Sequence, residues 1–167
     1  MLHNRFMAAL PFTTLLLGAM PAGNTQGPAL VPIRMIAQVG KKPVSMLGDG
    51  ECKHAPVAAV YGVRSKMWTV RFSGNPDGEI HNLYLTLWRP LAGGSPDQVS
   101  LAMRTDGTDY LIDTVKGGPQ RGSGTITFRP MAGGGGNFEL AGRTRDSTEI
   151  RLRVVCPSFV SLNPVGG

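Results

Sequence analysis

The chain has 167 residues, of which 41% are hydrophobic and 17% are charged, and its formal net charge is +6 at pH 7. This composition excludes an intrinsically disordered chain, and the length fits one domain with an ordinary buried core. The basic residues form no run of five or more and no nucleic-acid-binding motif is present, so we predict a solvated basic surface and no nucleic-acid partner.

The first 22 residues have the pattern of an export signal. Arg5 precedes an apolar run from Phe6 to Met20, and small residues near Ala22 provide a cleavage zone. The run is too short to span a bilayer as a helix, and no stop-transfer segment follows it. We therefore predict a signal peptide at 1–22 and a mature protein without a transmembrane helix, located in the periplasm or outside the cell. The alternative is an apolar N-terminal strand or a retained anchor.

The next segment, residues 23–40, is predicted to be an extended lead-in or linker. It begins with GNTQGPALVP, which is rich in turn-forming residues and proline. The β domain is predicted to occupy residues 41–160, and residues 161–167 are predicted to be a loose C-terminal tail.

Alternating apolar and polar residues predict β-strands along the whole domain, whereas no long segment after the leader has helical periodicity. The 23 glycines and 13 prolines fit short strands joined by turns. The predicted strands are MWTVRF (67–72), LYLTLW (83–88), VSLAMR (99–104), YLIDTV (110–115), GTITFRP (124–130), NFELAG (137–142) and TEIRLRVVC (148–156). We expect an all-β, single-domain antiparallel sandwich or barrel of about eight strands.

The chain contains two cysteines, Cys52 and Cys156, and in an exported protein an even number favours a disulfide. The alternation in the last predicted strand directs Cys156 into the core. In a sandwich the first and last strands often lie side by side, so we predict one disulfide between Cys52 and Cys156.

The spacing of Cys52 and His54 suggests an alternative in which these residues and Met46 bind copper, because Cu(I) prefers soft ligands. A single C-x-H has no second cluster of ligands to complete such a site. We therefore predict no metal and no cofactor, with His54 in a loop or at a strand edge.

No catalytic signature is complete. The nucleophile motif G-x-S-x-G is absent, and the glycine-rich segment 117–124 lacks the lysine of a phosphate loop. Only His54 and His81 follow the leader, which restricts any catalytic triad. The remaining option is a pair of carboxylates, drawn from Asp106, Asp109 and Asp113 or from Glu139 and Glu149.

Two sets of side chains are candidates for ligand binding. Tyr84 and Trp88 share one face of a predicted strand and could form a platform for a sugar or a peptide. The alternative is that this strand is covered on both faces and the two rings are simply buried. Arg151 and Arg153 could form a basic strip that meets anionic lipid or polysaccharide, or they could be part of an ordinary solvated face.

The features together favour an exported, non-catalytic β-sandwich that acts as a binding or structural module of the cell envelope. Its partners would be envelope polysaccharide, lipid or protein. The alternatives are a periplasmic copper-binding protein and a small exported hydrolase with a site assembled from distant residues.

Overall fold

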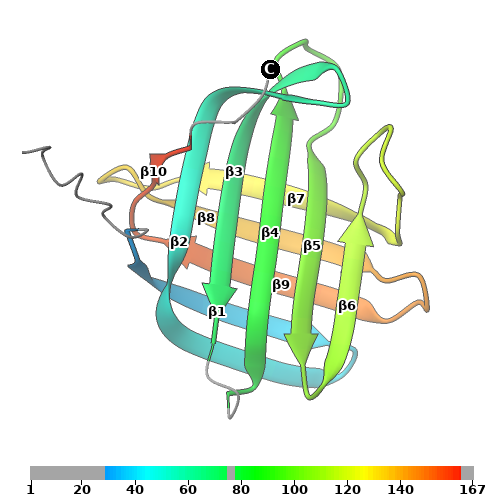
Figure 1. Ribbon diagram of the computed structural model, residues 1–167. Coiled ribbons are helices and arrows are strands. Elements are labelled where there is room, and N and C mark those ends of the chain that lie inside the picture. The colour runs from blue at the N-terminus through cyan, green and yellow to red at the C-terminus, as the bar shows by residue number, and fades with distance from the viewer. Residues whose placement is uncertain (1–28, 75–77, 163–167) are drawn as a thin grey trace, which may run out of the picture.

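Residues 29–74 and 78–162, the part of the chain that the computed structural model describes, form ten β-strands in one curved sheet (Figure 1). The strands are β1 (Val31–Val39), β2 (Lys42–Val60), β3 (Val63–Ser73), β4 (Ile80–Pro90), β5 (Gln98–Thr105), β6 (Thr108–Asp113), β7 (Ser123–Pro130), β8 (Gly136–Arg143), β9 (Glu149–Cys156) and β10 (Val160–Ser161). The predicted signal peptide (1–22) and the end of the predicted tail (163–167) lie outside the described residues.

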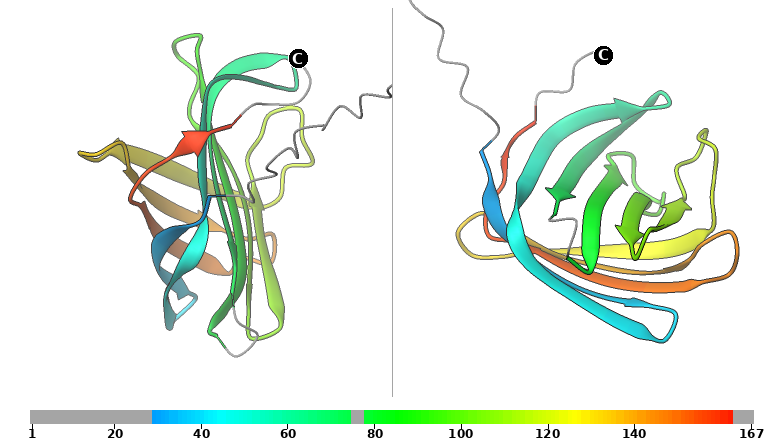
Figure 2. Two further views of the ribbon diagram at one scale, coloured as in Figure 1. Left: turned by 60° about the vertical axis from the view of Figure 1, so that its left-hand side comes forward. Right: turned by 60° about the horizontal axis from the view of Figure 1, so that its bottom comes forward.

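The sheet has the order β6-β5-β4-β3-β2-β1-β9-β8-β7, with β10 paired to β2, and it curls into a nearly closed barrel (Figures 1 and 2). The all-β prediction is confirmed, with ten strands instead of about eight. The β domain begins earlier than expected. Residues 31–39, placed in the lead-in 23–40, form a central strand between β2 and β9 and bury Ile33 and Met35.

The long strand β2 belongs to both layers of the barrel. Its first half pairs with β1 and its second half pairs with β3, and Gly50 is the residue shared by both ladders. A Cβ atom at Gly50 would lie 2.5 Å from the Cδ1 atom of Ile33 and 2.6 Å from the carbonyl oxygen of Arg71. Only glycine therefore lets the three strands approach this closely where β2 turns from one layer into the other. Figure 2 shows this curvature.

The barrel stays open between β6 and β7. Eight successive strand pairs, all antiparallel, separate these two strands, so they would have to pair in parallel to close the ring. A parallel pair requires a crossover of about a dozen residues or more, and the connection at 114–122 is shorter. Within the described residues, the only bridge across this seam joins Asp113 and Arg121.

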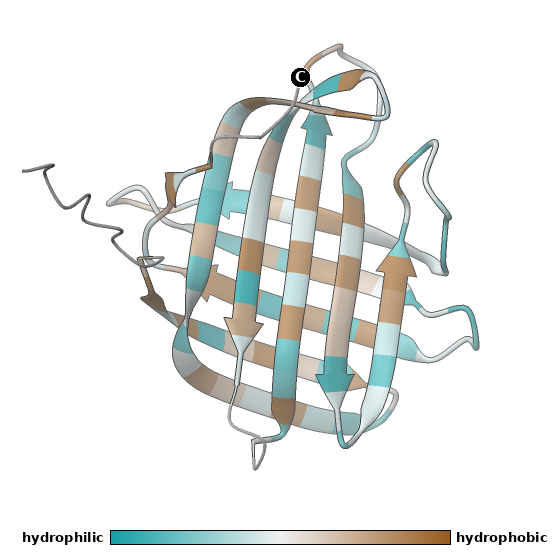
Figure 3. Cartoon of the chain, in the orientation of Figure 1, coloured by the Kyte–Doolittle hydropathy of each residue, from teal (hydrophilic) through white to brown (hydrophobic). Residues whose placement is uncertain are grey.

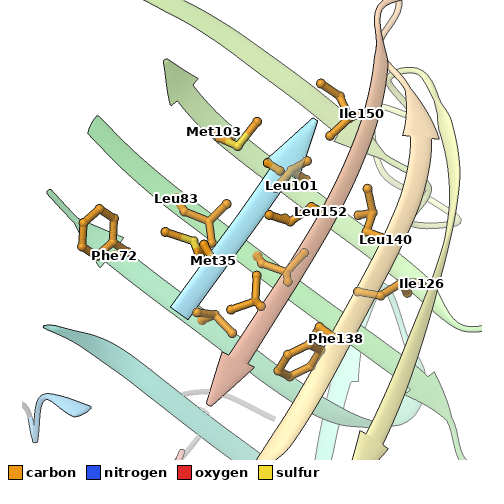
Figure 4. Close-up of a cluster of buried hydrophobic side chains, with 14 of the residues drawn as sticks. Met35, Phe72, Leu83, Leu101, Met103, Ile126, Phe138, Leu140, Ile150 and Leu152 are labelled. Atoms are coloured by element: carbon orange, nitrogen blue, oxygen red, sulfur yellow. The ribbon is translucent and has the colours of Figure 1, made fainter. Parts of the chain in front are cut away.

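The interior of the barrel is filled by apolar side chains from both layers (Figure 4). The sets predicted to share an inward face are buried, as Leu83 on β4 and Leu152 on β9 illustrate. Complete burial of one such side chain contributes about 1.5 to 3 kcal/mol, so the core is the main source of stability. The shallow hollows described below lie instead on the outer surface.

The predicted disulfide is confirmed: Cys52 of β2 is bonded to Cys156 of β9, with their Cα atoms 6.1 Å apart. The pairing of β1 explains why these residues meet. The β1–β2 ladder ends at the pair Val31–Gly50 and the β1–β9 ladder ends at the pair Arg34–Val155, and each cysteine lies just beyond the end of its ladder. The disulfide joins β2 and β9 directly there, and β10 then pairs with β2 next to the bond.

Replacing both Cys52 and Cys156 with alanine should lower the free energy of unfolding by about 2 to 5 kcal/mol, because the bond closes a loop with a sequence separation of 104. Urea denaturation of the wild type and of the double variant measures this difference. Wild-type protein reduced with dithiothreitol serves as the control and should unfold at the same urea concentration as the variant. An unchanged midpoint in the variant would contradict the role assigned to the bond.

Gly50→Ala should destabilise the protein by about 1 to 3 kcal/mol, because the added methyl group overlaps Ile33 and the backbone of Arg71. The matched control is Gly93→Ala, since nothing lies within 4 Å of the position that its Cβ would occupy. This surface change should stay within about 0.5 kcal/mol. Equal urea midpoints for the two variants would show that the bend of β2 tolerates a side chain.

Candidate functional site

The outer surface of strands β2, β1 and β9 brings arginine and apolar side chains together. Arg151 and Arg153, the predicted basic strip, both point outward on β9. The ladder places Arg153 opposite Ile36 and places Arg34 between Leu47 and Val155. We call this surface the arginine face; it consists of Arg34, Ile36, Leu47, Arg151, Arg153 and Val155.

The apolar members of the arginine face are well exposed: Leu47 is 69% exposed and Ile36 is 53% exposed. A hollow of about 130 Å³ lies between β1 and β9, and Arg34, Ile36, Arg153 and Val155 line it. Single exposed apolar residues are common on soluble proteins, but here they alternate with cations on the outer side of the sheet. A ligand with both anionic and apolar groups would complement this pattern.

The guanidinium groups of the arginine face are largely free. The neighbouring arginines of the same outer surface are paired, since Arg143 contacts Glu149 and Arg129 lies 3.9 Å from Glu139. In contrast, no salt bridge forms within the described residues at Arg34, Arg151 or Arg153. The Nε atom of Arg153 donates a hydrogen bond to Asn137 Oδ1 over 3.1 Å. The remaining donors are free to bind phosphate or carboxylate groups.

The spacing of these arginines suits a ligand with several anionic groups. Arg151 and Arg153 are two residues apart on one strand, which corresponds to about 7 Å. Arg34 is a diagonal neighbour of Arg153 on the adjacent strand, at about 7 to 8 Å. Arg34 and Ile36 were not predicted as site residues because residues 31–39 were assigned to the lead-in, and Leu47 was not predicted because no strand was assigned to residues 42–60. The alternation of buried Ile33 and Met35 was the available signal.

The predicted aromatic platform lies on the outer surface of the other layer. Tyr84 is 42% exposed and Trp88 is half-buried, and both point outward from β4. Figure 3 shows the alternating hydropathy of this strand. The guanidinium carbon of Arg71 lies 5.2 Å from the centre of the Tyr84 ring, a cation–π contact that holds the ring in place. The alternative in which both faces of this strand are covered is therefore not realised.

His54 lies in an aromatic stack near the disulfide, and not in the loop or at the strand edge that we expected. Its ring centre is 4.8 Å from that of Trp68, which is 4.7 Å from Phe128. The Nε2 atom of His54 is buried without a hydrogen-bond partner. Burial lowers the pKa of His54, and the positive charge of Lys66 lowers it further. The neutral imidazole is thus the form that this stack favours.

The copper alternative requires a thiolate that the folded protein does not offer. Cys52 is bonded to Cys156, and Met46 packs against the core. In residues 29–74 and 78–162, no group of three or more His, Cys, Asp or Glu side chains is placed to hold a metal ion. Copper binding through Cys52, His54 and Met46 therefore stays a prediction, and it applies only to protein in which the disulfide has been reduced.

Two of the candidate carboxylate pairs, Asp109 with Asp113 and Glu139 with Glu149, are too far apart for glycoside hydrolysis. Asp109 and Asp113 are four residues apart on β6, which corresponds to about 13 Å. Glu139 lies opposite Arg153, four residues from Glu149 along β9, which gives a similar distance. Glycosidases place their two carboxyl groups about 5 to 9.5 Å apart. Asp106 contacts Lys42 by an ion pair, so it is not a free base either.

No family model, curated protein or solved structure matches this chain. The arginine face and the aromatic pair Tyr84 and Trp88 are therefore the features of this barrel that bear on its function. In the part of the chain that the structure describes, no helix is long and apolar enough to cross a membrane.

The pH dependence of stability tests the environment of His54. Because burial lowers the pKa of this residue, the unfolded chain binds its proton more readily than the folded chain does. Stability should therefore fall as the pH drops below about 6.5, the pKa of an unperturbed histidine, towards the lower pKa of the folded state.

His54→Phe keeps an aromatic ring in the stack but cannot titrate. The melting temperature of this variant should fall less than that of the wild type between about pH 7.5 and 5. His81 and all carboxylates are present in both proteins and act as the internal control. Parallel curves for the two proteins would contradict the assignment of a neutral His54.

Proposed function

We propose that this protein is an exported, non-catalytic binding module of the cell envelope that holds an anionic polymer on its arginine face. One observation carries the proposal: on the outer side of the sheet, three arginines that form no salt bridge within the described residues surround exposed apolar side chains. Guanidinium groups bind phosphate and carboxylate groups in a bidentate manner, which gives both attraction and orientation.

The disulfide supports an exported location. Disulfides persist in oxidising compartments, such as the bacterial periplasm or the extracellular space, and are rare in the cytosol. The apolar leader at 1–22 is the second argument, because it has the charge and length of a signal peptide. The bond between Cys52 and Cys156 is consistent with this route.

The shape of the surface favours a polymer over a small molecule. Small ligands are usually bound in concave sites that bury most of their surface. The arginine face is instead the outer side of a curved sheet, and its hollows of about 130, 290 and 350 Å³ are separate depressions along the strands and do not form one deep cavity. A chain with repeated phosphate or carboxylate groups could contact all three arginines at once and gain affinity from each contact.

The placement of the candidate groups in the described residues is consistent with a binding role. The pairs Asp109–Asp113 and Glu139–Glu149 are separated by more than the distance that acid–base chemistry on a glycoside requires, and His54 is stacked on Trp68. Turnover of ester, glycoside or peptide substrates that is lost in His54→Ala would contradict this role.

Binding to immobilised polyphosphate and polygalacturonate tests the proposal, with neutral dextran as the blank. The wild type should bind at least one of the two polyanions, and binding should weaken between about 0.1 and 1 M salt as the Debye length falls from about 10 to 3 Å. Arg151→Glu combined with Arg153→Glu should weaken binding at least about tenfold, equivalent to about 1.4 kcal/mol. The melting temperature should fall slightly, because Arg153→Glu loses the hydrogen bond to Asn137 and faces Glu139, so binding is measured well below the midpoint.

The matched control is Arg121→Glu combined with Arg145→Glu, which changes the net charge equally at two exposed positions outside the arginine face. It should keep nearly wild-type affinity. Equal losses in both double variants would show that only net charge matters. Failure of the wild type to bind either polyanion would also contradict the proposal. Preference for one polymer would distinguish phosphate from carboxylate recognition.

A further inference from the structure

One end of the barrel carries an exposed apolar surface that the arginine face does not include. The β2–β3 hairpin reaches over this end, and the β4–β5 loop lies beside it (Figure 1). We call this surface the hairpin end. Its apolar members, with their exposed fractions, are Tyr61 (62%), Val57 (46%), Leu91 (43%) and Val63 (36%).

The turn of the hairpin places an aromatic residue where turn chemistry does not favour one. Tyr61 and Gly62 are the two central residues of the turn, with φ angles of +44° and +78°. Such turns normally contain asparagine, aspartate or glycine, because other residues are strained at positive φ. Tyr61 is nonetheless 62% exposed, so most of its side chain is available for an external contact in addition to its packing within the protein.

The hairpin end is held in place by the neighbouring connections. The ring of Tyr61 lies against the backbone of the β6–β7 connection: a Cβ atom on Gly117 would be 3.0 Å from the Tyr61 Cβ atom. The backbone N–H of Leu91 donates a hydrogen bond to the carbonyl oxygen of Arg64 over 2.9 Å. Residues from three connections therefore form one surface with a defined shape.

Every Asp, Glu, Lys or Arg side chain at positions 52–73 of the β2–β3 hairpin is a positively charged lysine or arginine. Residues 52–73 contain no aspartate or glutamate. Arg64 and Lys66 are exposed, and neither forms a salt bridge among the described residues. On the neighbouring β4–β5 loop, the carboxylate of Asp97 forms an ion pair with Arg89, with 2.6 Å between Oδ2 and Nη2. Figure 3 shows hydrophobic and hydrophilic segments side by side at this end.

We propose that the hairpin end docks on the surface of an anionic lipid bilayer. Val57, Tyr61, Val63 and Leu91 enter the headgroup region, while Arg64 and Lys66 contact lipid phosphates. Tyrosine is enriched at membrane interfaces because its ring is apolar and its hydroxyl is polar. Apolar burial combined with attraction between cations and anionic lipids is the usual basis of peripheral membrane binding.

The shape of the hairpin end favours a bilayer over a protein partner. A stable protein interface buries about 800 Å² on each side with close shape complementarity. Four side chains on a convex hairpin and one loop offer much less than this. A fluid lipid surface requires no complementary shape, so a small projecting group of apolar side chains is sufficient for reversible docking.

This inference does not depend on the polymer proposed for the arginine face. The hairpin end lies at the end of the barrel, whereas the arginine face lies on the outer side of β1 and β9, and the two share no residue. A protein docked through the hairpin end would keep the arginine face accessible.

Co-sedimentation with vesicles tests the inference. Wild-type protein should sediment with vesicles that contain 30% phosphatidylglycerol in phosphatidylcholine, and less with phosphatidylcholine alone. Tyr61→Asp combined with Leu91→Asp should reduce the bound fraction at least tenfold. Aspartate tolerates positive φ, so the turn is retained. The melting temperature should fall by a few degrees because the packing of the Tyr61 ring on the β6–β7 connection is lost, so binding is measured well below the midpoint.

The matched control is Leu30→Asp combined with Met131→Asp, which makes the same charge change at two exposed apolar residues outside both the hairpin end and the arginine face and should leave vesicle binding within twofold of wild type. Tyr61→Trp provides a second readout that needs no loss of function. Its additional tryptophan fluorescence should shift to shorter wavelength on vesicle binding and should be quenched by brominated lipid.

Three outcomes would overturn the inference. These are no sedimentation of the wild type with anionic vesicles, no quenching in Tyr61→Trp, or an equal loss of binding in the Leu30→Asp and Met131→Asp control. The last outcome would show that the loss comes from the change in net charge and not from the hairpin end. Failure of polymer binding would be seen separately, because that experiment contains no lipid.

Discussion

The whole barrel depends on the passage of one strand, β2, from the first layer into the second. At Gly50 this strand pairs with β1 on one side and with β3 on the other, and no side chain fits between them. Two residues later Cys52 joins β2 to the end of β9. The bend, the disulfide and the pairing of β10 thus fall within a few residues, and they fix how the two layers are oriented around the shared core.

Sequence patterns predicted the strands that have one buried and one solvated face, from β3 to β9, because their apolar residues alternate regularly. The same reasoning failed for β1 and β2. In β1 the outward Ile36 interrupts the alternation and Pro32 suggests a linker. In β2 the glycines and prolines that produce the bend and the bulge are the same residues that normally indicate loops. A strand that changes layer therefore looks like a connection in the sequence.

The candidate site shows the same limit. Arg151 and Arg153 were found because they alternate with a clear apolar set, but their neighbours on the arginine face come from the hairpin that was missed. Cys52 and Cys156 were paired correctly from their number and the expected compartment. His54 was misplaced, because a polar residue stacked on Trp68 in a partly buried aromatic cluster leaves no local pattern.

The open seam leaves the barrel with a strand edge that a closed ring would lack. In an antiparallel strand, the N–H and C=O groups of alternate residues point to the same side. Since Asp113 uses these groups to bridge to Arg121, Leu111 and Asp109 also present theirs to the seam. Asp109 and Arg121 lie at this edge, and charged side chains there disfavour pairing with a strand of another molecule. The open seam therefore leaves these backbone groups at an edge of β6, whereas the shared core and the disulfide keep the two layers together.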